Sequence, residues 1–434
     1  SVMRVSHCKS VVELGERTEN PKVLEKFPRN LPKYNCTAMY ARVMHARIEE
    51  NIKKIADYVE TCGINRVEMR DTKMGIICTG VMYAYIKDVF PNASVLKLGM
   101  SYPLPQNMIK DFASKVDKVY VIEELDPVIE EQVKSMGVDC VGKELFPACY
   151  ELLPDRLLDI CLENGILDKD PRTHDVKEVE NLPGRNPVLC AGCPHRSTYY
   201  VLKKHDIACA GDIGCYNLGA QPPFEAQHTM GCMGASIGQL HGMSLANLPE
   251  NRVCTIGDGT FWHSGLPALA NMVHNNGRGV VILMDNDNTA MTGHQDNPAT
   301  DYRVLRNVEA TKIDIPAVCR AMGVELVKTV NAFDVNEVEA GLKECMAYDK
   351  VSVLITKGEC VQFNKFSSTP YTVEADKCIA CQTCFKCGCP AIMVSDEENP
   401  KTHKKKCRID PTLCNGCGIC SQVCPVKAIV KKED

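Results

Sequence analysis

The sequence has 434 residues, enough for about three domains, and its 45% hydrophobic and 24% charged residues are typical of soluble globular proteins. The longest apolar runs, such as residues 280–284, are far shorter than a membrane span, and the net charge of −5 leaves no basic footprint for nucleic acid. Many of the 26 cysteines lie outside any motif, which favours a reducing cytoplasm over secretion. Because oxygen would oxidise such thiols, the composition also favours an anaerobic setting.

The first 165 residues predict a helix followed by a small α/β domain. Residues 40–60 carry apolar side chains at helical spacing. Short apolar segments at 75–80, 94–98 and 118–122 then alternate with helical stretches. Such alternation predicts a parallel sheet covered on both faces. We assign 1–65 to a leading segment and 66–165 to this domain.

Residues 166–187 are polar and contain Pro171, Pro183 and Pro187, so they predict a linker. A second α/β domain is predicted for residues 188–365. Its clearest strands are the apolar segments 253–256, 279–284 and 351–355.

Polar residues follow two of these strands in a pattern similar to the thiamine diphosphate motif. Gly257, Asp258 and Gly259 come directly after one strand, and Asn286 and Asn288 come after the next. A diphosphate is bridged to protein by Mg²⁺, which prefers oxygen ligands. The Asp258 carboxylate, the Asn286 amide oxygen and the Asn288 carbonyl supply them, and the glycines let the backbone approach the phosphates. A Gly-Asp-Gly sequence alone could equally be an ordinary loop.

A glycine-rich segment, residues 231–238, lies about 25 residues upstream of this motif. It could form a glycine-rich wall beside the cofactor that includes Gly231, with Met233 as an apolar prop beneath the thiazolium. The alternative is a helix start packed by small residues.

Four cysteines of the second domain could form one iron–sulfur site. Cys190 and Cys193 open the domain, Cys215 follows about 20 residues later, and Cys360 follows the last strand. These thiols can converge at one end of a parallel sheet. The alternative is a redox or zinc pair, Cys190 and Cys193, with the other two as buried thiols.

Residues 366–434 contain two cysteine runs that predict a bacterial-type ferredoxin domain with two [4Fe–4S] clusters. Each run gives three ligands to one cluster and a fourth, before proline, to the other. The predicted ligand sets are Cys378, Cys381, Cys384 and Cys424, and Cys414, Cys417, Cys420 and Cys389. Zinc-binding frameworks use Cys-x-x-Cys pairs instead. Cys387 competes with Cys389, which precedes the proline.

These residues together resemble the 2-oxoacid:ferredoxin oxidoreductases, above all the large (alpha) subunits of the indolepyruvate ferredoxin oxidoreductase type. The resemblance rests on the sequence segments 190–196, 211–216, 232–238, 257–265 and 289–295, together with the fused two-cluster module. The resemblance covers nearly the whole chain. It implies that Cys190, Cys193, Cys215 and Cys360 hold a third [4Fe–4S] cluster.

The resemblance implies a fold of two parallel-sheet α/β domains plus a C-terminal α+β ferredoxin domain. The first α/β domain is similar to a transketolase C-terminal domain. It implies oxidative decarboxylation of an aryl 2-oxoacid with coenzyme A, giving an acyl-CoA and CO₂, with electrons passed to ferredoxin. Cofactors are thiamine diphosphate, Mg²⁺ and three [4Fe–4S] clusters. His195, His263 and His294 are candidate acid–base or substrate contacts, and Arg196 a candidate ligand of a carboxylate or phosphate. Structural roles remain the alternatives.

The family's large subunit begins with a pyrimidine-binding domain, of which only the tail, around residues 5–13, is recognisable. The glutamate that activates thiamine has no match in the chain. The resemblance therefore implies a partner chain or fragment that carries this domain, a smaller beta subunit with the gamma domain, and a dimer of heteromers.

Three other functions stay open from the sequence. The chain could transfer electrons without thiamine chemistry of its own, or act as a non-oxidative thiamine enzyme. It could also prefer another 2-oxoacid, such as pyruvate or a branched-chain acid.

Overall fold

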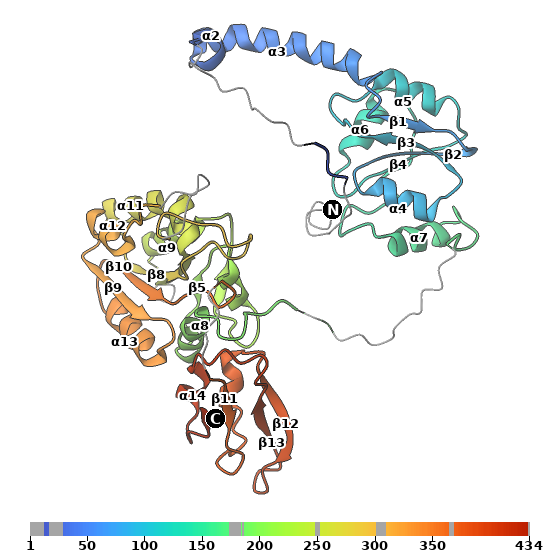
Figure 1. The fold of residues 1–434 in the computed structure, drawn as a ribbon. Helices are drawn as coiled ribbons and strands as arrows, with labels where there is room; N and C mark the ends of the chain where they lie inside the picture. Colours follow the sequence, from blue (N-terminus) through green and yellow to red (C-terminus); the bar gives the residue numbers. More distant parts are fainter. Residues whose placement is uncertain are drawn as a thin grey trace. The chain divides into compact units, whose positions relative to one another are not determined.

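A computed structural model describes residues 13–16, 29–172, 184, 186–247, 252–300, 310–363 and 369–432. The chain forms two compact units, Ser1–Asn181 and Leu182–Asp434. The predicted thiamine and ferredoxin domains therefore belong to one unit (Figure 1). Residues 5–12, taken as the tail of a pyrimidine-binding domain, and 173–183 of the predicted linker lie outside the described residues. None of the described helices is long and apolar enough to cross a membrane.

The first helices in the described part of the first unit are α2 (Leu31–Tyr34) and the long helix α3 (Ala38–Val59), which confirms the helix expected at 40–60. Thr37 precedes α3 in an extended conformation, as expected of a residue that starts a helix. Of the α3 residues only Val59 is buried, so this helix contributes little to the core of its unit.

A four-stranded sheet in the order β1-β3-β2-β4 forms the centre of this unit. The strands are β1 (Arg66–Glu68), β2 (Asp71–Thr79), β3 (Ala93–Leu98) and β4 (Val119–Ile122). The three predicted strands are confirmed and pair in parallel, with Ile76 of β2 opposite Val95 and Tyr120. The short polar strand β1 escaped prediction, and it runs antiparallel to β3.

Helices cover both faces of this sheet (Figure 1). The helices α4 (Met82–Val89) and α7 (Pro154–Glu163) pack on one face, and α5 (Gln106–Ala113) and α6 (Val128–Ser135) pack on the other. The apolar strands β2, β3 and β4 are buried between the two layers, as their near-continuous hydrophobic sequences predict.

The second unit is built on a six-stranded, wholly parallel sheet in the order β6-β5-β7-β8-β10-β9. The predicted strands are β7 (Val253–Gly257), β8 (Gly279–Asp285) and β10 (Val351–Lys357). Three further strands were not predicted, namely β5 (Cys209–Ala210), β6 (Gln227–Thr229) and β9 (Leu326–Asn331). All carboxyl ends of these strands lie at one edge, where ligands bind in open α/β sheets.

Two layers of helices enclose this sheet. The layer with α8 (His195–Lys204) and α13 (Val335–Met346) packs on one face. The other layer contains α9 (Ala235–Leu245), α11 (Leu266–His274) and α12 (Ile315–Ala321). A short turn of helix, α10 (Asp258–Thr260), and a π-helical turn, η2 (Phe261–Gly265), connect β7 to α11.

The ferredoxin module consists of two small antiparallel strand pairs. They are β11 (Tyr371–Val373) with β14 (Ile429–Lys431), and β12 (Ile392–Glu398) with β13 (Lys405–Ile409). In the chain, the 3-10 turn η3 (Thr383–Cys387) lies between β11 and β12, and the helix α14 (Ile419–Val423) lies between β13 and β14.

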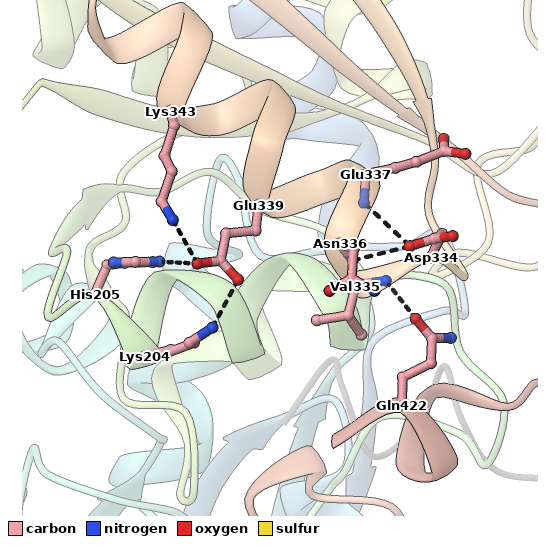
Figure 2. A network of polar contacts seen from close by, with 9 residues as sticks. All are labelled: Lys204, His205, Asp334, Val335, Asn336, Glu337, Glu339, Lys343 and Gln422. Carbon is pink, nitrogen blue, oxygen red and sulfur yellow. Dashed lines mark hydrogen bonds and ion pairs between the residues drawn. The ribbon is translucent and has the colours of Figure 1, made fainter. Parts of the chain in front are cut away.

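The module shares a hydrophobic core with the sheet domain, since Cys387 and Ile419 pack in one core with Leu189 and Tyr199. Polar contacts add to this attachment (Figure 2). The Gln422 side chain accepts a hydrogen bond from the backbone of Val335 (2.9 Å), at the start of α13, and donates to the Phe333 carbonyl. The module is therefore fixed on the face that carries α8 and α13.

Candidate functional site

A pocket lies where the carboxyl ends of β7 and β8 meet. Asp258, Asn286 and Asn288 are all nearly fully buried there. The pocket, here called the Asp258 pocket, is lined by residues that include Gly257, Asp258, Gly259, Asn286, Asn288, Met233, Tyr216 and His195. The structure thus brings together the residues of the predicted thiamine motif.

Three oxygen atoms face one another in this pocket. The Asn286 side-chain oxygen lies 2.7 Å from the Asn288 carbonyl oxygen and 3.1 Å from a carboxylate oxygen of Asp258, so it faces only acceptors. Adjacent oxygens around an octahedral Mg²⁺ lie about 3 Å apart, because each Mg–O bond is about 2.1 Å long. With its nitrogen in this position, the Asn286 amide donates to both oxygens, and with its oxygen there the three oxygens are spaced as ligands of one cation. The residue types and their spacing therefore fit Mg²⁺.

The electrostatics of Asp258 agree with a site for a cation. Burial, followed by the nearby Asp285 carboxylate, raises the pKa of Asp258 to about 7. The Asn297 side-chain amide donates to its second oxygen at 3.0 Å. A divalent cation would offset the cost of burying this carboxylate.

The glycines of this pocket are required by close packing. A side chain at Gly257 would collide with the Tyr216 ring, and one at Gly259 would collide with Thr289. The Tyr216 hydroxyl in turn donates to Thr260 Oγ1 at 2.9 Å. The backbone after β7 is therefore held close to the pocket, as a phosphate-binding turn requires.

Asp212, which sequence reasoning missed, organises the glycine-rich segment. Its fully buried carboxylate accepts hydrogen bonds from the backbone of Ile213 (2.9 Å), Gly234 (2.7 Å) and Ser236 (3.0 Å). Gly234 has a left-handed φ of 94°, and a side chain there would collide with Ser264. Asp212 thus fixes the start of α9, and this places Met233 in the Asp258 pocket. Gly231 is exposed and does not line it.

A second cavity lies next to the Asp258 pocket and contains all four cysteines of the predicted third cluster. We call it the four-cysteine cavity, and its lining includes Cys190, Cys193, Cys215 and Cys360. His195, Cys215, Asn286, Ala290 and Met291 line both cavities, so they form one shared wall. Burial raises the pKa of Cys193 to about 12 and that of Cys215 to about 11, and neighbouring cysteines add to both shifts. A bound cation is what would let such buried thiols ionise.

The ferredoxin module brings its predicted ligands together as well. Cys378, Cys381, Cys384 and Cys424 line one cavity, and Cys407, which the sequence did not single out, also lines it. Cys407 Sγ lies 4.0 Å from Cys378 Sγ. The backbone of Ala428 donates to Cys424 Sγ at 3.3 Å, the kind of bond that stabilises cluster sulfurs.

The second set of module cysteines also converges. Cys389, Cys414 and Cys417 are close enough to Cys420 to raise the pKa of its thiol, after burial, which is the main cause. The backbone of Tyr371 donates to Cys414 Sγ at 3.4 Å.

Cys387 also approaches this second set, but it packs elsewhere. It lies in the core shared with the sheet domain, whereas Cys389 packs inside the module with Cys420 and Cys424. Among the residues described, no group of three or more His, Cys, Asp or Glu side chains has the geometry of a single metal ion.

The assignment of Arg196 to a carboxylate or phosphate ligand is wrong. Its guanidinium is buried and donates to the backbone carbonyls of Leu189, Cys190, Cys387 and Gly388. No donor remains for an anionic substrate, because a guanidinium has five N–H groups and all are used.

The three candidate histidines occupy different places. His195 is buried in the shared wall, and burial, followed by the Arg196 charge, lowers its pKa to about 4, so it is neutral near pH 7. His294 lines the four-cysteine cavity, with Nδ1 3.4 Å from the Asn288 side-chain oxygen. His263 is exposed, bonds to Ser264 and lines neither cavity, so the structure gives it no place in the site.

Comparison with known proteins agrees with this arrangement. The family "Thiamine pyrophosphate enzyme, C-terminal TPP binding domain" matches residues 212–356, and the family "4Fe-4S binding domain" matches 408–430. A solved 2-oxoglutarate:ferredoxin oxidoreductase from Magnetococcus marinus covers 44% of this chain, and 72% of that chain, at 19% identity. Its TM-score of 0.36 is too low to support an argument.

Two curated relatives are named indolepyruvate oxidoreductase subunit IorA. The protein from Pyrococcus horikoshii is 35% identical over 99% of this chain and 72% of its own length. The protein from Thermococcus kodakarensis is 36% identical over 98% of this chain and 71% of its own length. The chain belongs to the family of IorA-type subunits of thiamine diphosphate-dependent 2-oxoacid:ferredoxin oxidoreductases, in which a thiamine diphosphate-binding domain is joined to a [4Fe–4S] ferredoxin module.

Proposed function

We propose that this chain carries out the oxidative decarboxylation of an aryl 2-oxoacid of the indolepyruvate type. Coenzyme A accepts the acyl group, and ferredoxin accepts the electrons. The observation that supports this most directly is the shared wall between the Asp258 pocket and the four-cysteine cavity. Decarboxylation on one side of this wall has an electron acceptor directly on the other.

The Asp258 pocket is the proposed site of thiamine diphosphate and Mg²⁺. Asp258, Asn286 and the carbonyl of Asn288 would hold the ion, and the backbone at Gly257 and Gly259 would face the phosphates. When bound, thiamine diphosphate supplies an electron sink for loss of CO₂. Met233 offers an apolar support within the same pocket.

Three [4Fe–4S] sites follow from the cysteine sets. We name the inner site after Cys190, Cys193, Cys215 and Cys360, the middle site after Cys389, Cys414, Cys417 and Cys420, and the outer site after Cys378, Cys381, Cys384 and Cys424. The contact between the inner and middle sites supports this order, since Asn415 donates to the Ala191 carbonyl at 2.7 Å. The outer cysteines line a cavity of the module itself.

The chain needs partners for the complete reaction. Its relatives are named as subunits, so it works within a larger assembly. We propose a smaller beta subunit with the gamma domain, a chain or fragment with the pyrimidine-binding domain and its activating glutamate, and ferredoxin. A dimer of such heteromers in the cytoplasm is the proposed assembly.

The test is a substrate panel on the anaerobically purified complex. Reduction of ferredoxin or a viologen dye is followed with indolepyruvate, phenylpyruvate, pyruvate, a branched-chain 2-oxoacid and 2-oxoglutarate, with and without coenzyme A. Reduction that is fastest with the aryl acids and depends on coenzyme A supports the proposal. Faster reduction with another acid replaces the substrate, and aldehyde release without reduction would overturn the oxidative mechanism.

A variant pair connects this activity to the Asp258 pocket. Asp258→Asn removes one charged Mg²⁺ ligand, and thiamine diphosphate affinity should fall at least about tenfold, since a single outer partner already changes metal affinity about tenfold. Asp206→Asn is the matched control, because Asp206 is exposed and lies in a turn after α8. Equal cofactor binding by both variants would remove Asp258 from the site and favour an electron-transfer subunit.

A further inference from the structure

Arg196 is a buried cation whose partners are all backbone carbonyls. It is 1% exposed and has the largest side chain among the fully buried residues. Its Nε and Nη2 donate to the Cys190 carbonyl at 3.1 and 2.7 Å, and Nη2 also reaches the Leu189 carbonyl. Its Nη1 donates to the carbonyls of Cys387 (2.9 Å) and Gly388.

These carbonyls belong to two cysteine loops that are far apart in sequence. One loop contains Cys190 of the inner site, and the other leads into Cys389 of the middle site. The planar guanidinium has five N–H donors in fixed directions, so it can bind carbonyls of two loops at the same time. Asn415, between Cys414 and Cys417, adds the bond to Ala191 described above, and a side chain at Gly192 would collide with it.

The charge of Arg196 has no carboxylate partner among the described residues, since none of the ion pairs found there includes it. A buried cation without an anion is unfavourable, because its hydration is lost and no opposite charge replaces it. Four thiolates around an iron–sulfur cube carry net negative charge. Such a group on each side of Arg196 would offset that cost.

Arg196 contacts the backbone of both sites. Its own N–H donates to the Cys193 carbonyl of the inner site at 3.3 Å. Its guanidinium donates to the Cys387 and Gly388 carbonyls, which lead into Cys389 of the middle site. One positive charge therefore faces both ligand sets.

We propose that Arg196 is a positioning residue that holds the inner and middle cluster loops in register and supplies the positive charge between them. This rests on the proposed iron–sulfur sites of the chain. A positive charge next to a cluster favours its reduced, more negative form, so Arg196 raises the reduction potential of both. Asn415 supports the register of the loops without contributing charge.

The experiment compares variants of the anaerobically purified holoprotein by redox titration with chemical mediators, followed by electron paramagnetic resonance. Arg196→Gln removes the charge and the fork. Arg196→Lys keeps the charge and loses the fork, and Asn415→Ala removes the second tether while Arg196 stays in place. Arg320→Gln is the matched control, because Arg320 is exposed on α12 and donates to the Val327 carbonyl.

Arg196→Gln should lower the ratio of reduced to oxidised inner and middle clusters about tenfold at a fixed potential, which is a shift of about 59 mV for a one-electron couple. Arg196→Lys and Asn415→Ala should keep the potentials near those of the unmodified protein but change the magnetic interaction between the two reduced clusters. The outer cluster should be unaffected in every variant.

Potentials and magnetic interaction that match the Arg320→Gln control in all three variants would overturn the proposal. If Arg196→Gln fails to retain its clusters, Arg196→Lys and Asn415→Ala still test the positioning role, and a magnetic interaction equal to that of the control in both variants would overturn it. The titration uses no 2-oxoacid. Failure of the proposed decarboxylation would therefore appear as absent substrate-driven reduction with normal potentials. Failure of this inference would appear as unchanged potentials in Arg196→Gln together with an unchanged magnetic interaction in the other two variants.

Discussion

Single side chains set the shape of the site, and Asp212 is the clearest example. Both of its oxygens accept backbone hydrogen bonds, so it holds Gly234 and Ser236 at the start of α9. The sequence offered a weak signal, because Asp212 follows the end of β5 as Asp258 follows the end of β7. The strand β5 is only two residues long and therefore gave no apolar pattern to place Asp212 at the sheet edge.

Asp212→Asn should loosen the glycine-rich segment and weaken thiamine diphosphate binding. The amide turns one acceptor into a donor that faces a backbone N–H, which costs about 1–3 kcal/mol for an unsatisfied buried group. Calorimetry with thiamine diphosphate and Mg²⁺, and hydrogen exchange of residues 230–240, measure the two effects. Exchange there as slow as in Asp206→Asn would refute this role of Asp212.

The two cysteine runs of the module have the same left-handed backbone conformation at two positions, but with different residues. Gly416 and Gly418 have left-handed φ angles of 69° and 77°, and Ala380 and Gln382 have φ angles of 57° and 60° at the equivalent positions. An L-residue in this conformation costs about 1–2 kcal/mol. The first run is therefore the more strained of the two.

Gln382→Gly should stabilise the first run by about 1 kcal/mol, because Gln382 is exposed and its side chain makes no capping hydrogen bond to η3. Gly418→Ala should destabilise the second run, where a new side chain would come 2.9 Å from the Tyr371 hydroxyl. The rate at which a chelator bleaches cluster absorbance reports both changes. Opposite signs are expected, and equal rates would contradict the strain argument.

At the scale of elements, Glu339 joins α8 to α13 (Figure 2). Its carboxylate bonds to Lys204 (2.7 Å), His205 (2.8 Å) and Lys343 (2.7 Å). Hydrogen bonds from Lys204 and Lys343 lower the pKa of Glu339 to about 2. Because the folded pKa lies below the unfolded value, its stabilisation is present above about pH 4.5 and is lost as the pH falls toward 2.

Glu339→Gln should therefore lower stability by about 1 kcal/mol near pH 7, a magnitude typical of partly exposed ion pairs. The same difference should persist down to pH 5 and shrink in 1 M salt, which screens such pairs. Thermal unfolding followed by circular dichroism measures it. A difference that disappears between pH 7 and pH 5 would show that another group is responsible.

Some elements were predictable because their sequence pattern is local. The buried strands β7, β8 and β10 are continuous apolar runs, and the glycines and polar residues after them mark the sheet edge. The edge strands β1, β6 and β9 escaped prediction because they are short, polar or partly exposed. Their pairing depends on neighbouring strands and not on their own residues.

On the scale of the whole molecule, the chain divides into two compact units. All proposed cofactor sites lie in residues 182–434, where the module and the sheet domain share a core. A fragment of these residues should fold without the first unit and retain about twelve iron atoms, as three [4Fe–4S] clusters require. Iron analysis after anaerobic purification tests this. Iron near four or eight atoms would show that one or two sites are incomplete in the fragment.

Contacts between residues that are far apart in the sequence could not be predicted. The cysteine spacing indicated which thiols group together, since each run is local in the chain. Arg196 was assigned to a substrate because its partners at 387 and 388 lie about 190 residues away. Cys407 was overlooked for a related reason, because it joins the module cavity only through the pairing of β12 with β13.

The wall that separates the Asp258 pocket from the four-cysteine cavity is only one side chain thick at His195 and Cys215. Any molecule that enters the pocket and presses on this partition must also disturb the sulfur environment behind it. An iron centre in the four-cysteine cavity would consequently serve as a built-in spectroscopic reporter. Ligand binding in the Asp258 pocket could then be followed, without a label, by the visible absorption and the electron paramagnetic resonance of that iron centre.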